Sequence, residues 1–272
     1  MYIVADIGGS KMRIAGSDDL ENFSEPVVLP TPQKYEEGIA VFTETALAVS
    51  AGESIEAVAA GVAGVFSQDK KILLRAPHLP LWGKHTYAAE LESALRTAVH
   101  VENDTASVGL GEVVAGAGKG GHIVAYVTVS TGVNGARIVD GVIDRTHLGF
   151  EIGGQYLFIG ADARTLEELV SGSAVGEKYA KPPKEIEKDS PLWEELARLF
   201  AYGLHNTILH WSPDRVVLGG SMFNEIGIPV ERVHFHLSGI MRKLPELPQI
   251  VHSSLGDLGG IHGGLARLRQ LR

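Results

Sequence analysis

Two stretches of this chain share one pattern, a pair of apolar runs joined by a glycine turn. The first is YIVADIGGSKMRIAG (residues 2–16) and the second is GHIVAYVTVSTGVNGARIVDG (residues 121–141). Short apolar runs bounded by glycine predict strands, and in both halves further strands and helices follow. A pattern used twice indicates one supersecondary unit built twice. We therefore expect an α/β protein made of two βββαβα units.

The elements expected in each half follow from the spacing of apolar residues. In the first half we expect strands at residues 2–7, at 12–17 and in EPVVLPTP, a helix from Tyr35 to Ser50, and strands in IEAVAAGVAG and VHVEND. The segments TYAAELESALRTA and TASVGLGEVVAGAG predict helices. In the second half the clearest elements are the long amphipathic segment PLWEELARLFAYGLHNTILHW, the strand PDRVVLGGS and the terminal helix GIHGGLARLRQL.

Composition excludes several classes of protein. The 272 residues are 44% hydrophobic and 21% charged, which suits one large or two modest globular domains. The net charge of −9 comes without any Lys/Arg cluster, so a nucleic-acid partner is not expected. The absence of cysteine excludes thiolate metal sites. The sequence has no run of 18 apolar residues, which a membrane helix would need, and it lacks the charged leader of a secreted protein. A cytoplasmic protein is therefore expected.

Three glycine turns stand at strand ends: DIGGSK (6–11), STGVNG (130–135) and LGGS (218–221). Glycine accepts positive φ and lets backbone N–H groups approach an anion closely, so such turns can cradle phosphates. Taken alone, such a turn is more often a simple hairpin turn than a phosphate site. None matches the P-loop pattern or the G-x-G-x-x-G dinucleotide pattern.

The segment VENDTA places Asp104 between a predicted strand and a predicted helix. One interpretation is a helix N-cap, a position that Asp favours. The other is a general base, because a carboxylate at such a strand end can accept the proton of a hydroxyl that attacks the γ-phosphate of ATP.

In these and further segments the chain resembles the ROK family of sugar kinases and repressors, within the actin-like ATPase superfamily. The resemblance rests on eight segments in family order, which are DIGGSK, APHLPLWG, ENDTA, STGVNG, FEIGG, LEELVSGSAV, VVLGGS and LGDLGGIHGGLARL. It implies a two-domain clamp with ATP and a sugar in the cleft. The domains expected are residues 1–107 and 108–257, with the helix 258–272 packing back on the first.

The resemblance also implies a role for individual residues. Asp104 would be the general base, and Asp6 would hold Mg²⁺ through water. The sugar would contact Gly64, Asn103, Asp104, Glu151 and Glu167. ATP would contact Asp6, Gly8, Gly9, Ser10 and Lys11 in the first half, and Thr131, Gly132, Gly219 and Gly220 in the second. A homodimer is implied by the resemblance alone.

The chain departs from the family pattern at the sugar motif. Many members carry a histidine where this chain has Gly154, followed by a cysteine cluster, and together these bind a structural zinc. We therefore expect no zinc, and we expect the segment after Gly154 to be ordered by packing of Tyr156, Leu157, Phe158 and Ile159. Ser130 and Asn134 also replace usual glycines in the second turn. His234 and His236 share a strand face but not a helix face, and no third ligand has a recognisable spacing.

The function expected from the resemblance is ATP-dependent phosphorylation of a hexose, with glucose the first choice. A second hypothesis is a sugar or nucleotide sensor that kept the fold and lost catalysis, motivated by Gly154. A third, an actin-like ATPase that polymerises, leaves Glu151 and Glu167 unexplained. The absence of a helix-turn-helix before the first strand disfavours the repressor branch.

Overall fold

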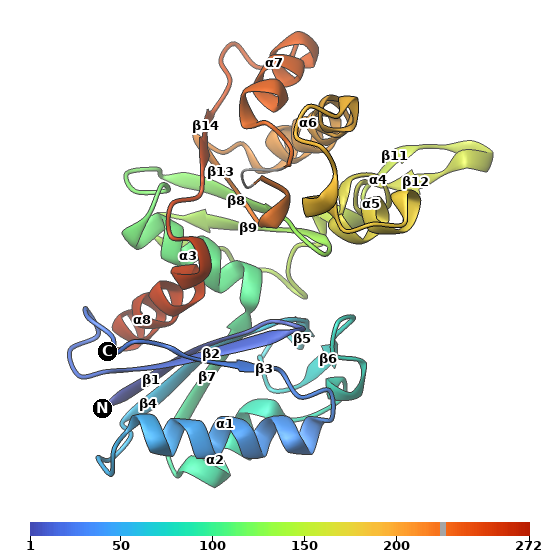
Figure 1. Cartoon of the computed structure of the whole chain (residues 1–272). Helices are drawn as coiled ribbons and strands as arrows, with labels where there is room; N and C mark the ends of the chain where they lie inside the picture. The colour runs from blue at the N-terminus through green and yellow to red at the C-terminus, as the bar shows by residue number, and fades with distance from the viewer. Residues whose placement is uncertain (224–226) are drawn as a thin grey trace. The chain divides into compact units, whose positions relative to one another are not determined.

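The computed structural model describes residues 1–223 and 227–272 (Figure 1). Its strands are β1 (Tyr2–Ile7), β2 (Lys11–Ser17), β3 (Val27–Pro30), β4 (Ala57–Val62), β5 (Val65–Phe66), β6 (Leu73–Arg75), β7 (Ala98–Asn103), β8 (Ile123–Val129), β9 (Val133–Val139), β10 (Val142–Ile143), β11 (Tyr156–Phe158), β12 (Arg164–Thr165), β13 (Arg215–Gly219) and β14 (Gln249–His252). Its α-helices are α1 (Tyr35–Val49), α2 (Tyr87–Leu95), α3 (Asp104–Ala115), α4 (Leu166–Val170), α5 (Gly172–Tyr179), α6 (Pro191–Trp211), α7 (Val230–Ile240) and α8 (Gly259–Leu271).

Contacts within the chain divide it into two compact units. The first holds residues 1–115, 145–149 and 257–272, and the second holds residues 116–144 and 150–256. The domain boundary expected at residue 107 falls inside α3, which the contacts keep whole in the first unit. A hydrogen-bonded helix is a poor place to divide a chain, since domain boundaries fall in exposed linkers.

The two main sheets have the same strand order. In the first unit the order is β3-β2-β1-β4-β7, and in the second it is β10-β9-β8-β13-β14. Each sheet begins with an antiparallel three-strand meander and continues with two parallel strands. The α/β class and the repeated βββαβα unit predicted from the glycine hairpins are confirmed.

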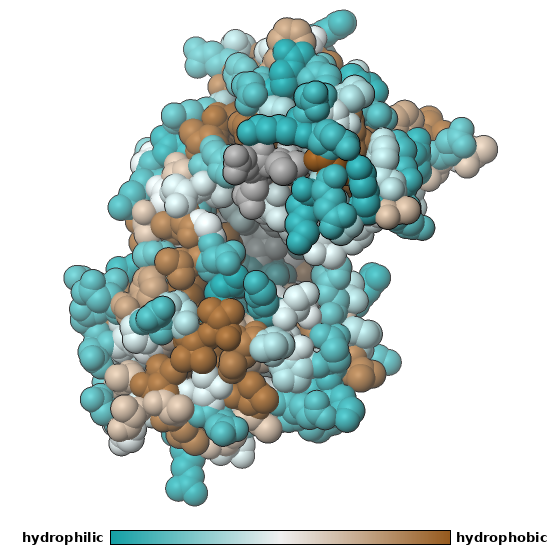
Figure 2. Space-filling model, in the orientation of Figure 1, coloured by the Kyte–Doolittle hydropathy of each residue, from teal (hydrophilic) through white to brown (hydrophobic). Residues whose placement is uncertain are grey.

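Successive side chains of β1 point to opposite faces of the first sheet, as the two-residue period of a strand requires. Ile3, Ala5 and Ile7 pack into the cluster that includes α1 and α2. Tyr2 and Val4 pack on the other face against Ile261, Leu265 and Leu268 of α8. Figure 1 shows α1 and α2 on one side of this sheet and α8 on the other. The edge strand β3 leaves Val27 and Val28 exposed, and Figure 2 shows hydrophobic residues gathered over β2 and β3.

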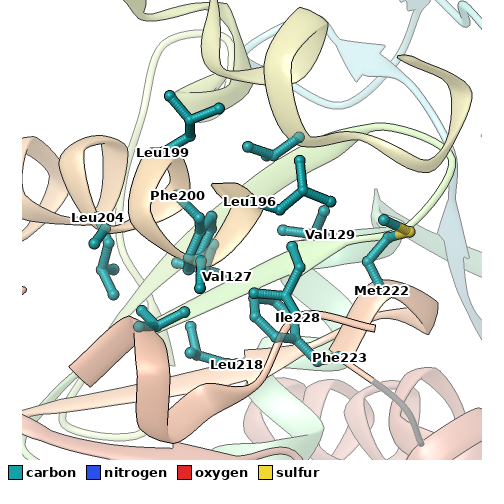
Figure 3. Close-up of a cluster of buried hydrophobic side chains, with 14 of the residues drawn as sticks. Val127, Val129, Leu196, Leu199, Phe200, Leu204, Leu218, Met222, Phe223 and Ile228 are labelled. Carbon is teal, nitrogen blue, oxygen red and sulfur yellow. The ribbon is translucent and has the colours of Figure 1, made fainter. Parts of the chain in front are cut away.

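The core of the second unit lies between its sheet and α6. Figure 3 shows Val127 and Val129 of β8 facing the side chains of α6, with Leu218 of β13 beside them. Ser190 caps α6 and Pro191 occupies its first turn, which is a favourable start for a helix. Burying one Leu or Phe side chain stabilises a fold by about 1.5–3 kcal/mol, so the buried face of this long helix contributes much of the stability of the second unit. The prediction of one amphipathic helix over residues 191–211 is confirmed.

One expectation for the second unit was wrong. After Gly154 the chain forms a two-stranded hairpin of β11 and β12, and Leu157 packs against the core as expected. Tyr156, Phe158 and Ile159 are instead exposed, by 64%, 40% and 90% respectively. The backbone pairing of β11 with β12 orders this segment, and only one side chain in four packs inward.

Other expectations concerned histidines, tryptophans and membranes. His234 and His236 lie on α7, and His236 Nε2 is 2.8 Å from Glu194 Oε1. No three His, Asp or Glu side chains come together as a metal site in residues 1–223 and 227–272. Trp82 and Trp193 are core residues. Within those same residues, no helix has both the length and the apolar character needed to cross a bilayer.

Helices α3 and α8 approach so closely that their backbones nearly touch. A Cβ added at Gly263 would lie 1.8 Å from the carbonyl oxygen of Ser107, and one added at Gly111 would lie 2.1 Å from that of Gly259. Such contacts leave no room for any side chain, so glycine is required at the crossing.

We expect Gly263→Ala to destabilise the protein by at least about 1–3 kcal/mol, the usual cost of overpacking, because the new methyl group meets backbone. The matched control is Gly239→Ala in α7, where no described atom lies within 4 Å of the added Cβ. That control should gain about 0.4–1 kcal/mol. Urea unfolding of both variants measures the difference, and equal stability would show that the crossing is not tight.

Candidate active site

The turn between β1 and β2 presents open backbone N–H groups. Thr31 Oγ1 donates to the carbonyl of Gly8 (2.8 Å), the Thr31 N–H donates to that of Ser10 (3.0 Å), and Gln33 Nε2 donates to that of Gly9 (3.2 Å). The carbonyl oxygens of Gly8, Gly9 and Ser10 are therefore all engaged by donors of the segment 31–33. Within the described residues, the N–H groups of Gly9 and Ser10 have no acceptor. Adjacent free N–H groups in such a turn form a cradle for an anion.

The turn between β8 and β9 is built in the same way. The N–H of Gly172 donates to the carbonyl of Ser130 (2.7 Å), and that of Ser173 donates to the carbonyl of Thr131 (3.2 Å). The N–H groups of Thr131 and Gly132 face no acceptor in the part of the chain that the structure describes. Both predicted phosphate turns thus tie their carbonyls back and leave two N–H groups open.

Asp6 lies at the carboxyl end of β1 beside other charged groups. The antiparallel register places Arg13 opposite it, with Nη1 3.6 Å from Asp6 Oδ2, and Arg13 Nη2 is 2.5 Å from Asp257 Oδ2. The Asp6 side chain is only 14% exposed. Burial raises its pKa to about 7; the charge of Asp104 adds to the rise, and Arg13 opposes it. Below about pH 7 this carboxyl is therefore largely protonated in the absence of a cation.

Asp104 is the first residue of α3, directly after β7. The capping interaction comes from the residue before it, because Asn103 Oδ1 accepts the N–H of Ala106 (3.1 Å). The N-cap interpretation of Asp104 is therefore wrong. Asp104 Oδ1 accepts from Thr105, through its N–H (2.7 Å) and hydroxyl (3.4 Å). Burial raises the pKa of Asp104, while these hydrogen bonds and the charge of His78 lower it.

The parallel strands of the first unit explain how these residues meet. Along β1, β4 and β7 the register aligns Asp6 with Gly61 and Gly61 with Glu102. A Cβ on Gly61 would lie 3.4 Å from the Cα of Asp104, and one on Gly260 of α8 would lie 2.6 Å from Cγ of Asp6. Glycine at both positions lets α3 and α8 approach the strand ends and brings the two carboxylates together.

Gly64 and Asn103 form one contact at the same strand ends. Asn103 Nδ2 donates to the carbonyl of Gly64 at 3.0 Å. Gly64 has φ +149°, and a Cβ there would lie 2.6 Å from the carbonyl of Arg75, so glycine is required. Lys11, in contrast, is exposed and has no ion pair with any described residue.

In the second unit, two predicted carboxylates belong to segments that pack on the β8–β9 turn. Glu167 Oε2 accepts the N–H of Val133 at 2.8 Å. The segment of Glu151 contacts the same residue, since a Cβ on Gly153 would lie 2.2 Å from the Val133 carbonyl. The neighbouring Gly220 has φ +93°, and a Cβ there would lie 2.3 Å from the carbonyl of Val129. Thr131, Gly132, Glu151, Glu167, Gly219 and Gly220 are thus gathered around the ends of β8 and β13.

Sequence reasoning missed several residues around the first turn. Arg13 could have been found, because a hairpin centred on the Gly-Gly pair places it opposite Asp6. Thr31 and Gln33 carry no motif, and only the fold brings them to the turn. His78 lies in the quoted segment APHLPLWG, but no role was assigned to it.

Comparison with known proteins places these features in a family. The model of the ROK family matches residues 2–270. The chain is 29% identical to a glucokinase of Streptomyces coelicolor over 149 residues, 55% of this chain and 47% of that protein. It is 27% identical to the N-acetyl-D-glucosamine kinase of Vibrio cholerae over 97% of this chain and 98% of that one.

A solved structure shows the same fold. The ROK family glucokinase from Streptomyces griseus, in complex with glucose and AMPPNP, superposes with a TM-score of 0.82 at 24% identity, covering 99% of each chain. This likeness confirms the actin-like ATPase fold. Together with the family model, which spans nearly every residue, it shows that the chain belongs to the ROK family.

Proposed function

We propose that this protein is an ATP-dependent sugar kinase that transfers the γ-phosphate of ATP to a hydroxyl of a hexose, with glucose the first candidate. Asp104 accepts the proton of the attacking hydroxyl. The observation that carries the proposal is the position of this carboxylate, half-buried beside Asp6 in the unit whose first turn presents open N–H groups. Its raised pKa suits a general base better than that of an ordinary Asp, because proton transfer is most efficient when the pKa approaches the working pH.

The carboxylates of the first unit fit a magnesium ion. Burial and the charges of Asp104 and Asp257 raise the pKa of Asp6, and the charge of Arg13 offsets only part of this rise. Oxygen ligands of this kind suit Mg²⁺, which keeps several waters and binds through one or two carboxylates and the substrate phosphates. Asp6 would hold the ion through water. The ion would neutralise charge on the phosphates, while the N–H groups of Gly9 and Ser10 bind and orient them.

The remaining predicted residues complete the proposal. Gly8 and Lys11 flank the first phosphate turn, Thr131 and Gly132 hold phosphate in the second unit, and Gly219 and Gly220 leave room for adenosine. On the sugar side, Gly64, Asn103, Glu151 and Glu167 contact hydroxyl groups. We also propose a homodimer, which the family resemblance supports. We propose that it lacks structural zinc, because Gly154 replaces the family histidine and the chain has no cysteine, and that it works in the cytoplasm.

Asp104→Asn should lower kcat by about 10²–10⁴-fold, because the amide cannot take the hydroxyl proton. Sugar binding should persist, since the amide keeps the size of the side chain and Asn103 still caps α3. A coupled ADP-release assay and calorimetric titration with the sugar measure the two quantities.

The matched control is Asp18→Asn, an exposed aspartate, which should behave as wild type. A turnover of Asp104→Asn equal to that of wild type would refute the assignment of the base.

A second candidate function is a sensor that binds sugar or nucleotide without turnover. It is favoured by Gly154, where the family histidine is missing and no described atom lies within 4 Å of an added Cβ. That open position removes one expected sugar contact. The retained Asn103 and Asp104 favour the kinase, because a sensor needs no base beside a hydroxyl.

A panel of sugars with MgATP separates the two functions. We expect ADP release with at least one hexose, and glucose, fructose and N-acetylhexosamines should be tested first. Binding of AMPPNP without ADP release on any sugar would favour the sensor. Mass spectrometry of the product confirms phosphorylation.

A further inference from the structure

The proposed function leaves unused a histidine that is seated on the first phosphate turn. His78 lies in the loop between β6 and the 3₁₀ turn η1 (Pro80–Trp82). A Cβ built on Gly9 would lie 2.5 Å from the Cβ of His78 and 3.2 Å from its carbonyl oxygen. The backbone of this loop therefore packs directly on the turn, and glycine at position 9 is what permits the contact.

Buried neighbours on both sides fix the loop. Leu79 is fully buried, and its N–H donates to the carbonyl of Ala76 at 3.0 Å. Trp82 is also fully buried; its ring stacks on Tyr87, and Nε1 donates to the carbonyl of Pro32 at 3.1 Å. The backbone of His78 is thus held in place while its side chain stays exposed.

His78 also acts electrostatically on the proposed base. Burial raises the pKa of Asp104, and the charge of His78 is among the effects that lower it, so the imidazole lies within electrostatic range of this carboxylate. Among the described residues, the imidazole has no hydrogen-bond partner and no ion pair. Arg13 is engaged with Asp6 and Asp257, and Lys34 with Glu37, whereas Lys11 at the end of the turn has no ion pair with any described residue.

The residue that carries this donor packs on Gly9, whose N–H is one of the two open groups of the phosphate turn, so its imidazole N–H is available to a phosphoryl group held there. We propose that His78 is a second catalytic residue, which donates an imidazole N–H to a non-bridging oxygen of the phosphoryl group during transfer. This inference rests on the kinase function proposed above. It assigns to the segment 76–83 a role in the reaction rather than in the fold alone.

The step balances without any proton transfer by His78. The sugar oxygen forms a bond to the γ-phosphorus, and the bond from that phosphorus to the bridging oxygen breaks. ADP leaves with the electron pair, and Asp104 receives the hydroxyl proton. The imidazole N–H stabilises the negative charge spread over the phosphoryl oxygens, which is where a preorganised donor acts most strongly.

Two substitutions test the inference, His78→Ala and His78→Gln. Loss of one preorganised donor costs on the order of 10²–10³ in kcat, so we expect a decrease of that order for His78→Ala. His78→Gln keeps an N–H donor and should recover part of the rate. The KM for the sugar should stay close to the wild-type value in both. The matched control is His122→Gln, an exposed histidine of the second unit, which should retain full activity.

Each outcome separates this inference from the proposed function. If wild type is active and His78→Ala has the same kcat, the inference is overturned and the kinase function stands. If His78→Ala keeps its kcat but raises the KM for the sugar, His78 contacts the sugar and the inference is also overturned. A wild type inactive on every sugar overturns both. Thermal melting checks folding, and if His78→Ala fails to fold, the kcat of His78→Gln decides.

Discussion

The candidate active site of the first unit depends on the crossing of α3 and α8. Gly111 and Gly263 allow backbone-to-backbone contact there, and no larger residue would fit. Because α3 begins with Asp104 and α8 begins beside Asp6, this crossing determines how closely the two carboxylates approach. Burial, and after it the charge of Asp104, raises the pKa of Asp6 to about 7, so the ionised pair is electrostatically unfavourable on its own. Strain of this kind is common at functional sites, where a ligand supplies the compensating charge.

The repeat along the chain gives each unit the same kind of anion cradle. In both hairpin turns the carbonyl oxygens are tied by donors from other segments, Thr31 and Gln33 in one unit and the start of α5 in the other. The glycines alone would only permit such a turn. The donors from other segments hold the carbonyl oxygens and leave the N–H groups open, and this is the geometry on which the proposed phosphate binding rests. Glu167 extends this arrangement, since it binds the N–H that follows the second turn.

The sequence predicted the elements well where their pattern is local. The period of two in β1, the amphipathic α6 and the two glycine hairpins each follow from neighbouring residues, so the repeated unit and the fold class could be predicted. Contacts between distant segments could not. No local sequence pattern indicated that Asn103 rather than Asp104 caps α3, or that the loop of His78 packs on Gly9. The exposure of Tyr156, Phe158 and Ile159 was also missed, because backbone pairing rather than apolar packing orders that hairpin.

The central claim is that phosphoryl transfer requires Asp6 and Asp104 in their ionised forms. Both carboxyls have raised pKa values, so each binds protons at a higher pH than an ordinary Asp and loses them as the pH rises. The pH dependence of kcat/KM for MgATP reports the essential groups of the free enzyme. We expect kcat/KM to increase with pH and to level off above about pH 7, following the value at Asp6. A profile that is flat from about pH 5 to 8 would contradict the account, because ordinary carboxyls are already ionised throughout that range.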